Sequence, residues 1–228
     1  SAASTVENAV WGIYTADNTE HGGTGTGIAD AQHPFGNGDQ ICLDPATGTT
    51  EIQGTVDVEE LMIKSLSKLT SKGEGAEIKA QKIVGDLSVE SGARVYVNDI
   101  KGDLEIGSGS TDGPGFSPGI RTQEGDYTVG TGVTLEIEID GATPGEGGYD
   151  QYQIIGDMII ESNTTLNLVV DTSYTSSLAV GKEVIIAKVT GNITGQFDHV
   201  NWSGVIATQQ LIVTTRNVGS VTELVATV

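Results

Sequence analysis

Four aspartates in a repeated dipeptide are the residues whose type and spacing could do chemistry. Each follows a glycine, and they are Asp86, Asp103, Asp126 and Asp157. Carboxylate oxygens presented from loops are ligands for a hard cation such as Ca²⁺. A Gly-Asp pair also makes a tight turn, so a structural role is the alternative. The chain contains no D-x-[DN]-x-[DN]-G loop, so calcium is predicted here without an assigned ligand set.

The residues that enzyme chemistry needs are few and scattered. The histidines do not stand at metal-ligand spacing from one another: His21, His33 and His199. A polysaccharide lyase needs a basic residue that acts as a base or holds the carboxylates of its substrate, and a glycosidase needs paired carboxylates. The arginines are widely spaced: Arg94, Arg121 and Arg216. We therefore expect a protein that is not an enzyme.

Composition excludes several classes of function. The 228 residues include 31 acidic and 11 basic side chains, which gives a formal net charge of −20. A chain this acidic has no basic surface for nucleic-acid phosphates or anionic lipids, so neither partner is expected. No run of 18 apolar residues occurs, so no membrane insertion is expected either. Cys42 is the only cysteine, which excludes a disulfide within the chain.

The first quarter of the chain differs from the rest in charge. Residues 1–60 contain ten acidic side chains and no lysine or arginine. Residues 7–14 have the composition of a strand, whereas the Gly- and Thr-rich residues 21–37 are typical of a loop. We predict an acidic N-terminal segment at residues 1–52 and one β-domain at residues 53–228.

From residue 53 onward, apolar and polar side chains alternate with a period of two. Residues 55–58 (TVDV) and 77–80 (EIKA) are examples of the pattern that strands show when one face is buried. Residues 58–69 (VEELMIKSLSKL) fit either two short strands or a helix, and we favour the strands. Helical periodicity is otherwise scarce, so the fold class is predicted as all-β.

An internal repeat begins at each of four Gly-Asp pairs. The four copies start at Gly85, Gly102, Gly125 and Gly156, and each continues into a short alternating strand and a second corner of small residues. A unit that cannot bury its own apolar face must stack on its neighbours. The repeat therefore predicts a β-solenoid that resembles a right-handed parallel β-helix, with a β-sandwich as the alternative. Uneven spacing between copies predicts insertions at residues 108–123 and 140–152.

An ordered series of motifs follows the second copy. In order they are GPGFSPGI at 113–120, GDYTV at 125–129, TLEIEI at 134–139, GATPG at 141–145, YDQY at 149–152 and VIIAKVTGNITGQFDHV at 184–200. This series resembles the C-terminal part of autotransporter-type passenger regions and related bacterial surface proteins with autotransporter-associated β-strand repeats. The resemblance covers residues 85–228. It implies a secreted or cell-surface β-solenoid used for adhesion, coating or stalk-like structure, and it implies no catalytic residue.

Both ends of the chain contain apolar strands, and an unpaired strand edge can pair with another subunit. The residues that we consider candidates for such assembly lie in residues 9–14 and 224–228: Val10, Trp11, Ile13, Tyr14, Leu224, Val225 and Val228. We hypothesise that one terminal strand is donated to the next subunit. The alternative is an ordinary strand or cap within its own subunit.

These observations predict a secreted, self-assembling structural protein of an extracellular bacterial fibre, sheath or matrix, whose main partner is itself. The small residues at positions 1–4 are typical of a processed secretory signal, or of a cloning remnant. The alternative function is a glycan-binding adhesin module without polymerisation, since five aromatic residues could stack on sugars: Trp11, Tyr149, Tyr152, Tyr174 and Trp202. Three glycosylation sequons begin at Asn163, Asn192 and Asn201.

Overall fold

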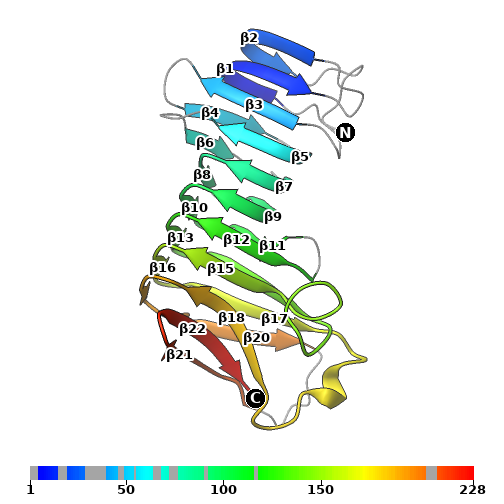
Figure 1. The fold of residues 1–228 in the computed structure, drawn as a ribbon, viewed down its shortest axis with the longest axis vertical. Helices are drawn as coiled ribbons and strands as arrows, with labels where there is room; N and C mark the ends of the chain where they lie inside the picture. The colour runs from blue at the N-terminus through cyan, green and yellow to red at the C-terminus, as the bar shows by residue number, and fades with distance from the viewer. Residues whose placement is uncertain are drawn as a thin grey trace.

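The computed structural model describes an elongated all-β molecule in which strands stack from one end to the other (Figure 1). The described residues are 5–14, 20–28, 40–45, 49–53, 55–63, 68–71, 77–89, 92–115, 118–203 and 210–228, with side chains from residue 78 onward except residue 79. The N-terminal strands lie at one end of the molecule and the C-terminal strands lie at the other.

The strands are short and mostly separated by tight corners. The first eleven are β1 Thr5–Tyr14, β2 Glu20–Ile28, β3 Gln40–Pro45, β4 Thr49–Gln53, β5 Thr55–Ile63, β6 Lys68–Ser71, β7 Glu77–Val84, β8 Asp86–Val89, β9 Arg94–Lys101, β10 Leu104–Ile106 and β11 Thr111–Pro114. The others are β12 Ile120–Glu124, β13 Tyr127–Val129, β14 Thr134–Ile139, β15 Gln151–Ile155, β16 Met158–Ile160, β17 Thr165–Val170, β18 Glu183–Val189, β19 Ile193–Thr194, β20 His199–Ser203, β21 Ile212–Val218 and β22 Val221–Thr227. Among the described residues, one 3₁₀ turn, η1, spans Thr175–Ser177.

The sheet is mostly parallel because each strand pairs with the corresponding strand of the next copy. One run of parallel pairs is β4–β6–β8–β10–β13–β16–β19. A second run is β3–β5–β7–β9, which divides into β11–β14–β17–β20 and β12–β15–β18. These pairings agree with the expected all-β class, and they do not fit the β-sandwich alternative, whose sheets are antiparallel.

The core lies between these runs, and it is filled by the alternate side chains of each strand that point inward. In β14, for example, Leu135, Ile137 and Ile139 are buried, whereas the threonine and glutamates between them are half-buried. Full burial of such a side chain stabilises a fold by about 1.5–3 kcal/mol. The alternation predicted from the sequence is thus the feature that packs one copy on the next.

The second run divides because the chain inserts residues at one place in every copy after β9. Strand β9 is continuous, but its counterparts are interrupted by residues 115–119, 140–150 and 171–182. The first two interruptions fall within the insertions predicted from the spacing. A buried polar cluster lies where β11 and β12 separate.

Antiparallel strands occur at the two ends. At the N-terminal end, β1 pairs antiparallel with β2, β3 and β4. At the C-terminal end, β22 pairs antiparallel with β18 and β21. The prediction of a loop at residues 21–37 was wrong for residues 21–28, which belong to β2, because backbone pairing with β1 outweighs a glycine-rich composition. Residues 58–69 contain β5 and β6, so the strand interpretation is confirmed.

Candidate functional site

The four Gly-Asp aspartates form a column along one corner of the stack. In each case Oδ1 accepts a hydrogen bond from a backbone amide of the next copy, so that Asp86 accepts from Asp103 at 3.0 Å and Asp103 from Asp126 at 2.8 Å. Asp126 accepts in the same way from Asp157 at 2.8 Å. The aspartates therefore tie successive copies together, in addition to occupying turns.

The column continues into a fifth copy that the sequence analysis missed. Asp157 Oδ1 accepts from the backbone amide of Asn192 at 2.7 Å, and Gly191 takes the place of the copy's glycine. The missed signal was the pair Gly191-Asn192, in which an amide replaces the carboxylate. Spacing between copies increases along the chain, from 17 residues for the first pair to 35 for the last, which hides the fifth copy from a search at fixed period.

The glycines of the column are required for close approach of the backbones. A Cβ on Gly102 would overlap the carbonyl oxygen of Gly85, and one on Gly125 would overlap that of Gly102. Both glycines also have positive φ, +153° and +148°. No other residue fits at these positions without displacing the copy beneath, so the dipeptide is a packing motif with a defined geometric reason.

Three aspartates of the column, Asp86, Asp103 and Asp126, line a shallow groove of about 310 Å³ with Glu105 and Ile159. Within the described residues, no group of three or more His, Cys, Asp or Glu side chains is arranged to hold a metal ion. The predicted calcium residues are therefore brought into one line, with one oxygen of each engaged by a backbone amide.

A second polar cluster lies inside the molecule, between β11, β12, β13 and β15. Arg121 is completely buried and forms a two-pronged ion pair with Asp112, with both N–O distances 2.7 Å. Its guanidinium also donates to the carbonyl oxygens of Gly113 at 2.7 Å and Val97 at 3.0 Å. Each of the three guanidinium nitrogens thus donates to at least one oxygen, and pairing of this kind is what allows a charge to be buried.

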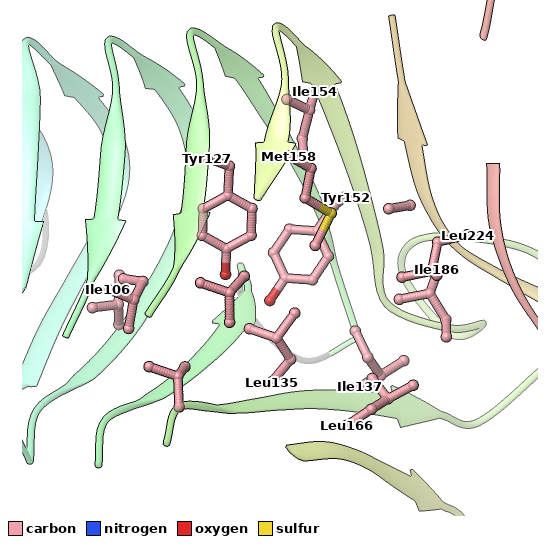
Figure 2. Close-up of a cluster of buried hydrophobic side chains, with 14 of the residues drawn as sticks. Ile106, Tyr127, Leu135, Ile137, Tyr152, Ile154, Met158, Leu166, Ile186 and Leu224 are labelled. Carbon is pink, nitrogen blue, oxygen red and sulfur yellow. The ribbon is translucent and has the colours of Figure 1, made fainter. Parts of the chain in front are cut away.

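Two tyrosine hydroxyls complete the cluster. Tyr127 and Tyr152 both donate to Oδ2 of Asp112, the latter at 3.0 Å. The two rings lie 5.5 Å apart, and the Arg121 guanidinium carbon lies 5.2 Å from the centre of the Tyr152 ring. Figure 2 shows the tyrosines side by side in the interior, among apolar side chains that include Leu135 and Ile137.

Burial and charge determine the protonation of this cluster. Burial raises the pKa of Tyr127 and Tyr152 well above the usual range, and the neighbouring Asp112 charge raises both further. Burial lowers the pKa of Arg121, but the charge of Asp112, its hydrogen bond and the two neighbouring tyrosines act together in the opposite direction, and the pKa is raised. At neutral pH the cluster is an ion pair flanked by two neutral phenols. All four side chains are closed to solvent, so the arrangement stabilises the interior and offers no place for a substrate.

Asp150 links two loops of the stack that lie far apart in the sequence. Its two oxygens accept backbone amides from Gly119 at 2.6 Å and Glu138 at 2.7 Å, so it joins insertions of two successive copies. Burial raises the pKa of Asp150 to about 7, although these two amides favour the charged form. Burial also raises the pKa of Glu138, with the charges of Asp140 and Glu136 acting in the same direction.

A groove of about 480 Å³ lies at the C-terminal end, between β20 and the β21–β22 pair. Phe197, Val200, Val213 and Leu224 contribute apolar side chains to it, and Thr214 and Thr215 contribute polar ones. Leu224 and Phe197 also belong to the core. This groove is therefore an open end of the core and not a separate cavity on the surface.

The predicted assembly residues lie in strands that pair on both sides. Val10, Trp11, Ile13 and Tyr14 lie in β1, between β2 and β3. At the other end, Leu224 and Val225 lie in β22, between β18 and β21, and Val228 follows directly after it. Leu224, Val225 and Val228 are buried. Within the described strands, the edges that pair on one side only belong to β2 at the N-terminal end and to β19, β20 and β21 at the C-terminal end.

Other predicted residues are placed as follows. Tyr149 and Tyr152 are buried and Tyr174 and Trp202 are half-buried against the core. Cys42 lies in β3 and His21 in β2, and His33 lies outside the described residues. Asn163 is exposed at a corner with φ of 59°, while Asn192 is the fifth column residue and Asn201 lies in β20.

The described part of the chain contains no helix with the length and apolar character that a membrane span requires. Comparison with known protein families found no family that matches this sequence. A search of curated proteins likewise found no match.

Proposed function

We propose that the protein is a secreted β-solenoid, of the right-handed parallel β-helix type, that serves as a structural subunit of an extracellular bacterial fibre, sheath or matrix. The observation that carries the proposal is the continuous parallel stacking, in which hydrogen bonds and packing run along the long axis from copy to copy. Such a molecule is built to extend and to resist unfolding along one direction. The resemblance to autotransporter-type surface proteins supports the same function.

Two further observations support a structural role over catalysis. The one buried cluster of ionisable side chains that we described, around Arg121, is sealed from solvent. The aspartate column uses its carboxylates to bind backbone amides of neighbouring copies. In both places polar groups hold the fold together, which is how a load-resisting subunit uses them. Secretion or cell-surface display follows from the proposed resemblance.

The alternative function, glycan binding, finds less support. Two of its five aromatic residues, Tyr149 and Tyr152, are buried and cannot stack on a sugar ring. The remaining described ones, Tyr174 and Trp202, pack against the core. The one aromatic side chain that lines the groove at the C-terminal end is Phe197, which is buried, whereas sugar-stacking sites use exposed aromatic faces.

Electron microscopy combined with light scattering tests the proposal. The protein is concentrated at low salt, at about 1 M salt and with added calcium, because screening weakens the repulsion between molecules of charge −20. Ordered polymers are expected, and they should form most readily at high salt or with calcium. A monodisperse monomer under all three conditions would exclude a self-assembling structural role. In that event, retention of the monomer on immobilised glycans would favour the adhesin module.

A further inference from the structure

We propose that the open C-terminal end of one molecule is covered by the N-terminal end of a second copy, so that subunits join head to tail. This inference depends on the proposed function and specifies its joint. The occupant is the end that contains β1 and β2, and the receiving surface, which we call the C-terminal face, comprises β19, β20, β21 and the groove between β20 and β21 (Figure 1).

The core is incomplete at the C-terminal face. Val200 pairs with Leu166 and Trp202 with Leu168 in register, so these residues of β20 occupy interior positions. Leu166 is completely buried, but Val200 is 37% exposed, because no described strand lies beyond β20. The 480 Å³ groove beside it continues this opening. Apolar side chains at interior positions gain free energy when another layer covers them.

Backbone hydrogen bonding is incomplete at both ends of the molecule. Within the described strands, β19 pairs only with β16, β20 only with β17 and β21 only with β22. At the opposite end β2 pairs only with β1. An unpaired strand edge is a template for pairing with another chain. A head-to-tail joint provides hydrogen-bond partners for unpaired strand edges at both ends of the molecule. A joint between two C-terminal faces leaves the edge of β2 unpaired.

The distribution of charge disfavours contact between two N-terminal ends and favours contact between an N-terminal end and the C-terminal face. Residues 1–63 contain ten acidic side chains and no lysine or arginine, so two N-terminal ends repel each other. The strands of the C-terminal face and β22 contain one arginine, Arg216, and one acid, Glu223, which pair with each other at 2.9 Å. Arg216 also pairs with Glu183 at 2.7 Å, and Asp198 is exposed between β19 and β20. The C-terminal face thus carries far fewer acidic side chains than residues 1–63 and repels an acidic partner less than a second N-terminal end does.

The geometry of such a joint favours an open polymer. The two surfaces are different parts of the chain, so each subunit keeps one free end after every addition. An interface of this heterologous kind builds filaments when its rotation does not close a ring. The long axis of the stack, which runs between these two ends in Figure 1, then becomes the axis of the filament.

Charge substitutions at Val200 test the joint. Val200→Glu places a negative charge opposite the acidic end and is expected to raise the concentration needed for assembly on the order of tenfold at low salt. Val200→Lys places a positive charge there and is expected to assemble at a lower concentration than Val200→Glu. This difference between the two variants should shrink at about 1 M salt. Sedimentation and electron microscopy measure both.

Matched variants separate the joint from general effects. Ile159→Glu introduces the same charge at a side chain of similar exposure, 40%, on the flank of the stack in β16, and is expected to assemble like the wild type. Ile212→Glu is a second joint variant on the exposed strand β21, where the side chain is 59% exposed. It should behave like Val200→Glu. Thermal unfolding of each variant monitors the fold.

The outcomes distinguish the joint from the function. Wild-type polymers that are unaffected by both glutamate variants would overturn the joint and leave the structural function standing. Equal loss of assembly with Val200→Glu and Val200→Lys would show that the partner surface is not acidic, and would also overturn it. Particles that stop at two copies would indicate paired C-terminal faces instead. A wild-type protein that remains monomeric would overturn the function together with the joint.

Discussion

The aspartate column and the Arg121 cluster both use an aspartate to link neighbouring strands, but they do so in opposite environments. In the column, an exposed carboxylate such as that of Asp103 accepts one backbone amide from the next copy, and the same bond occurs four times. In the cluster, the buried Asp112 accepts from one arginine and two tyrosines at once. The column repeats a weak bond, whereas the cluster concentrates strong ones at a single position.

This contrast teaches how an irregular stack keeps its register. A repeated bond cannot distinguish one copy from another, because every rung offers the same donor and acceptor. The Arg121 cluster has no counterpart of its composition among the described copies, so it defines which strands meet where β9 gives way to β11 and β12. We therefore expect each bond of the column to add a small and similar amount to the free energy of unfolding. We expect the loss of the cluster to lower that free energy much more.

The largest expected effect comes from removing one member of the ion pair. Arg121→Met leaves the Asp112 charge buried without its partner, and such a change destabilises proteins by about 3–5 kcal/mol. Urea unfolding followed by circular dichroism measures the loss. The double variant Arg121→Met with Asp112→Leu removes both charges and should recover much of the stability. A single variant as stable as the wild type would show that the cluster does not anchor the interior.

The next largest effect is expected at a glycine of the column. Gly125→Ala introduces a Cβ that overlaps the carbonyl oxygen of Gly102, at a φ of +148°. Strain of this kind destabilises a protein by about 1–3 kcal/mol, and the steric overlap adds to it. Gly147→Ala is the control, because φ is +67° there but nothing lies within 4 Å of the new atom. Equal losses of unfolding free energy in the two variants would mean that close approach of the copies is unimportant.

Sequence patterns predicted the column and the strands because both depend on neighbours in the chain. A Gly-Asp pair followed by alternating residues is visible without knowledge of any partner. The Arg121 cluster was not predicted, since Arg121, Tyr127 and Tyr152 lie 9, 15 and 40 residues from Asp112 along the chain, and the four side chains meet only after two copies have stacked. The available signal was Arg121 itself, which is the only basic residue in the sequence between Lys101 and Lys182.

The ends of the molecule were also only partly predictable. An apolar strand was expected at each end, but the sequence analysis did not show that these strands are covered by β2 and β21. Antiparallel pairing to β1 turned a glycine-rich segment into a strand, a tertiary effect that local composition does not encode. The fifth copy was missed because Asn192 replaces the aspartate while its backbone amide makes the same bond to Asp157.

Stability is also expected to depend on pH through Asp150, a buried aspartate whose two oxygens accept the backbone amides of Gly119 and Glu138. Burial raises its pKa to about 7 in the folded state, compared with 3.8 for an ordinary aspartate. The folded protein therefore binds more protons than the unfolded chain between these values, and the free energy of unfolding should fall as pH rises from 4 to 7. Urea unfolding across this range measures the slope.

A matched substitution isolates the contribution of Asp150. Asp150→Asn keeps an oxygen that can accept an amide but removes the titration, so the decrease in stability between pH 4 and 7 should become smaller. The decrease that persists would come from other carboxyls, including Glu138, whose pKa burial also raises. An unchanged slope in Asp150→Asn would place the titrating group elsewhere.

The smallest effect is expected from substituting an aspartate of the column. Such a substitution tests most directly what one of the repeated aspartate–amide bonds contributes to stability. Asp103→Ala removes the acceptor for the amide of Asp126, and losing one exposed hydrogen bond of this kind should lower the free energy of unfolding by about 0.5–1.5 kcal/mol. Asp103→Asn keeps the acceptor oxygen and should lose less. The fifth copy already uses asparagine at the equivalent position, Asn192. If Asp103→Asn were as destabilising as Asp103→Ala, the carboxylate charge itself would matter, and the case for a bound cation along the column would gain weight.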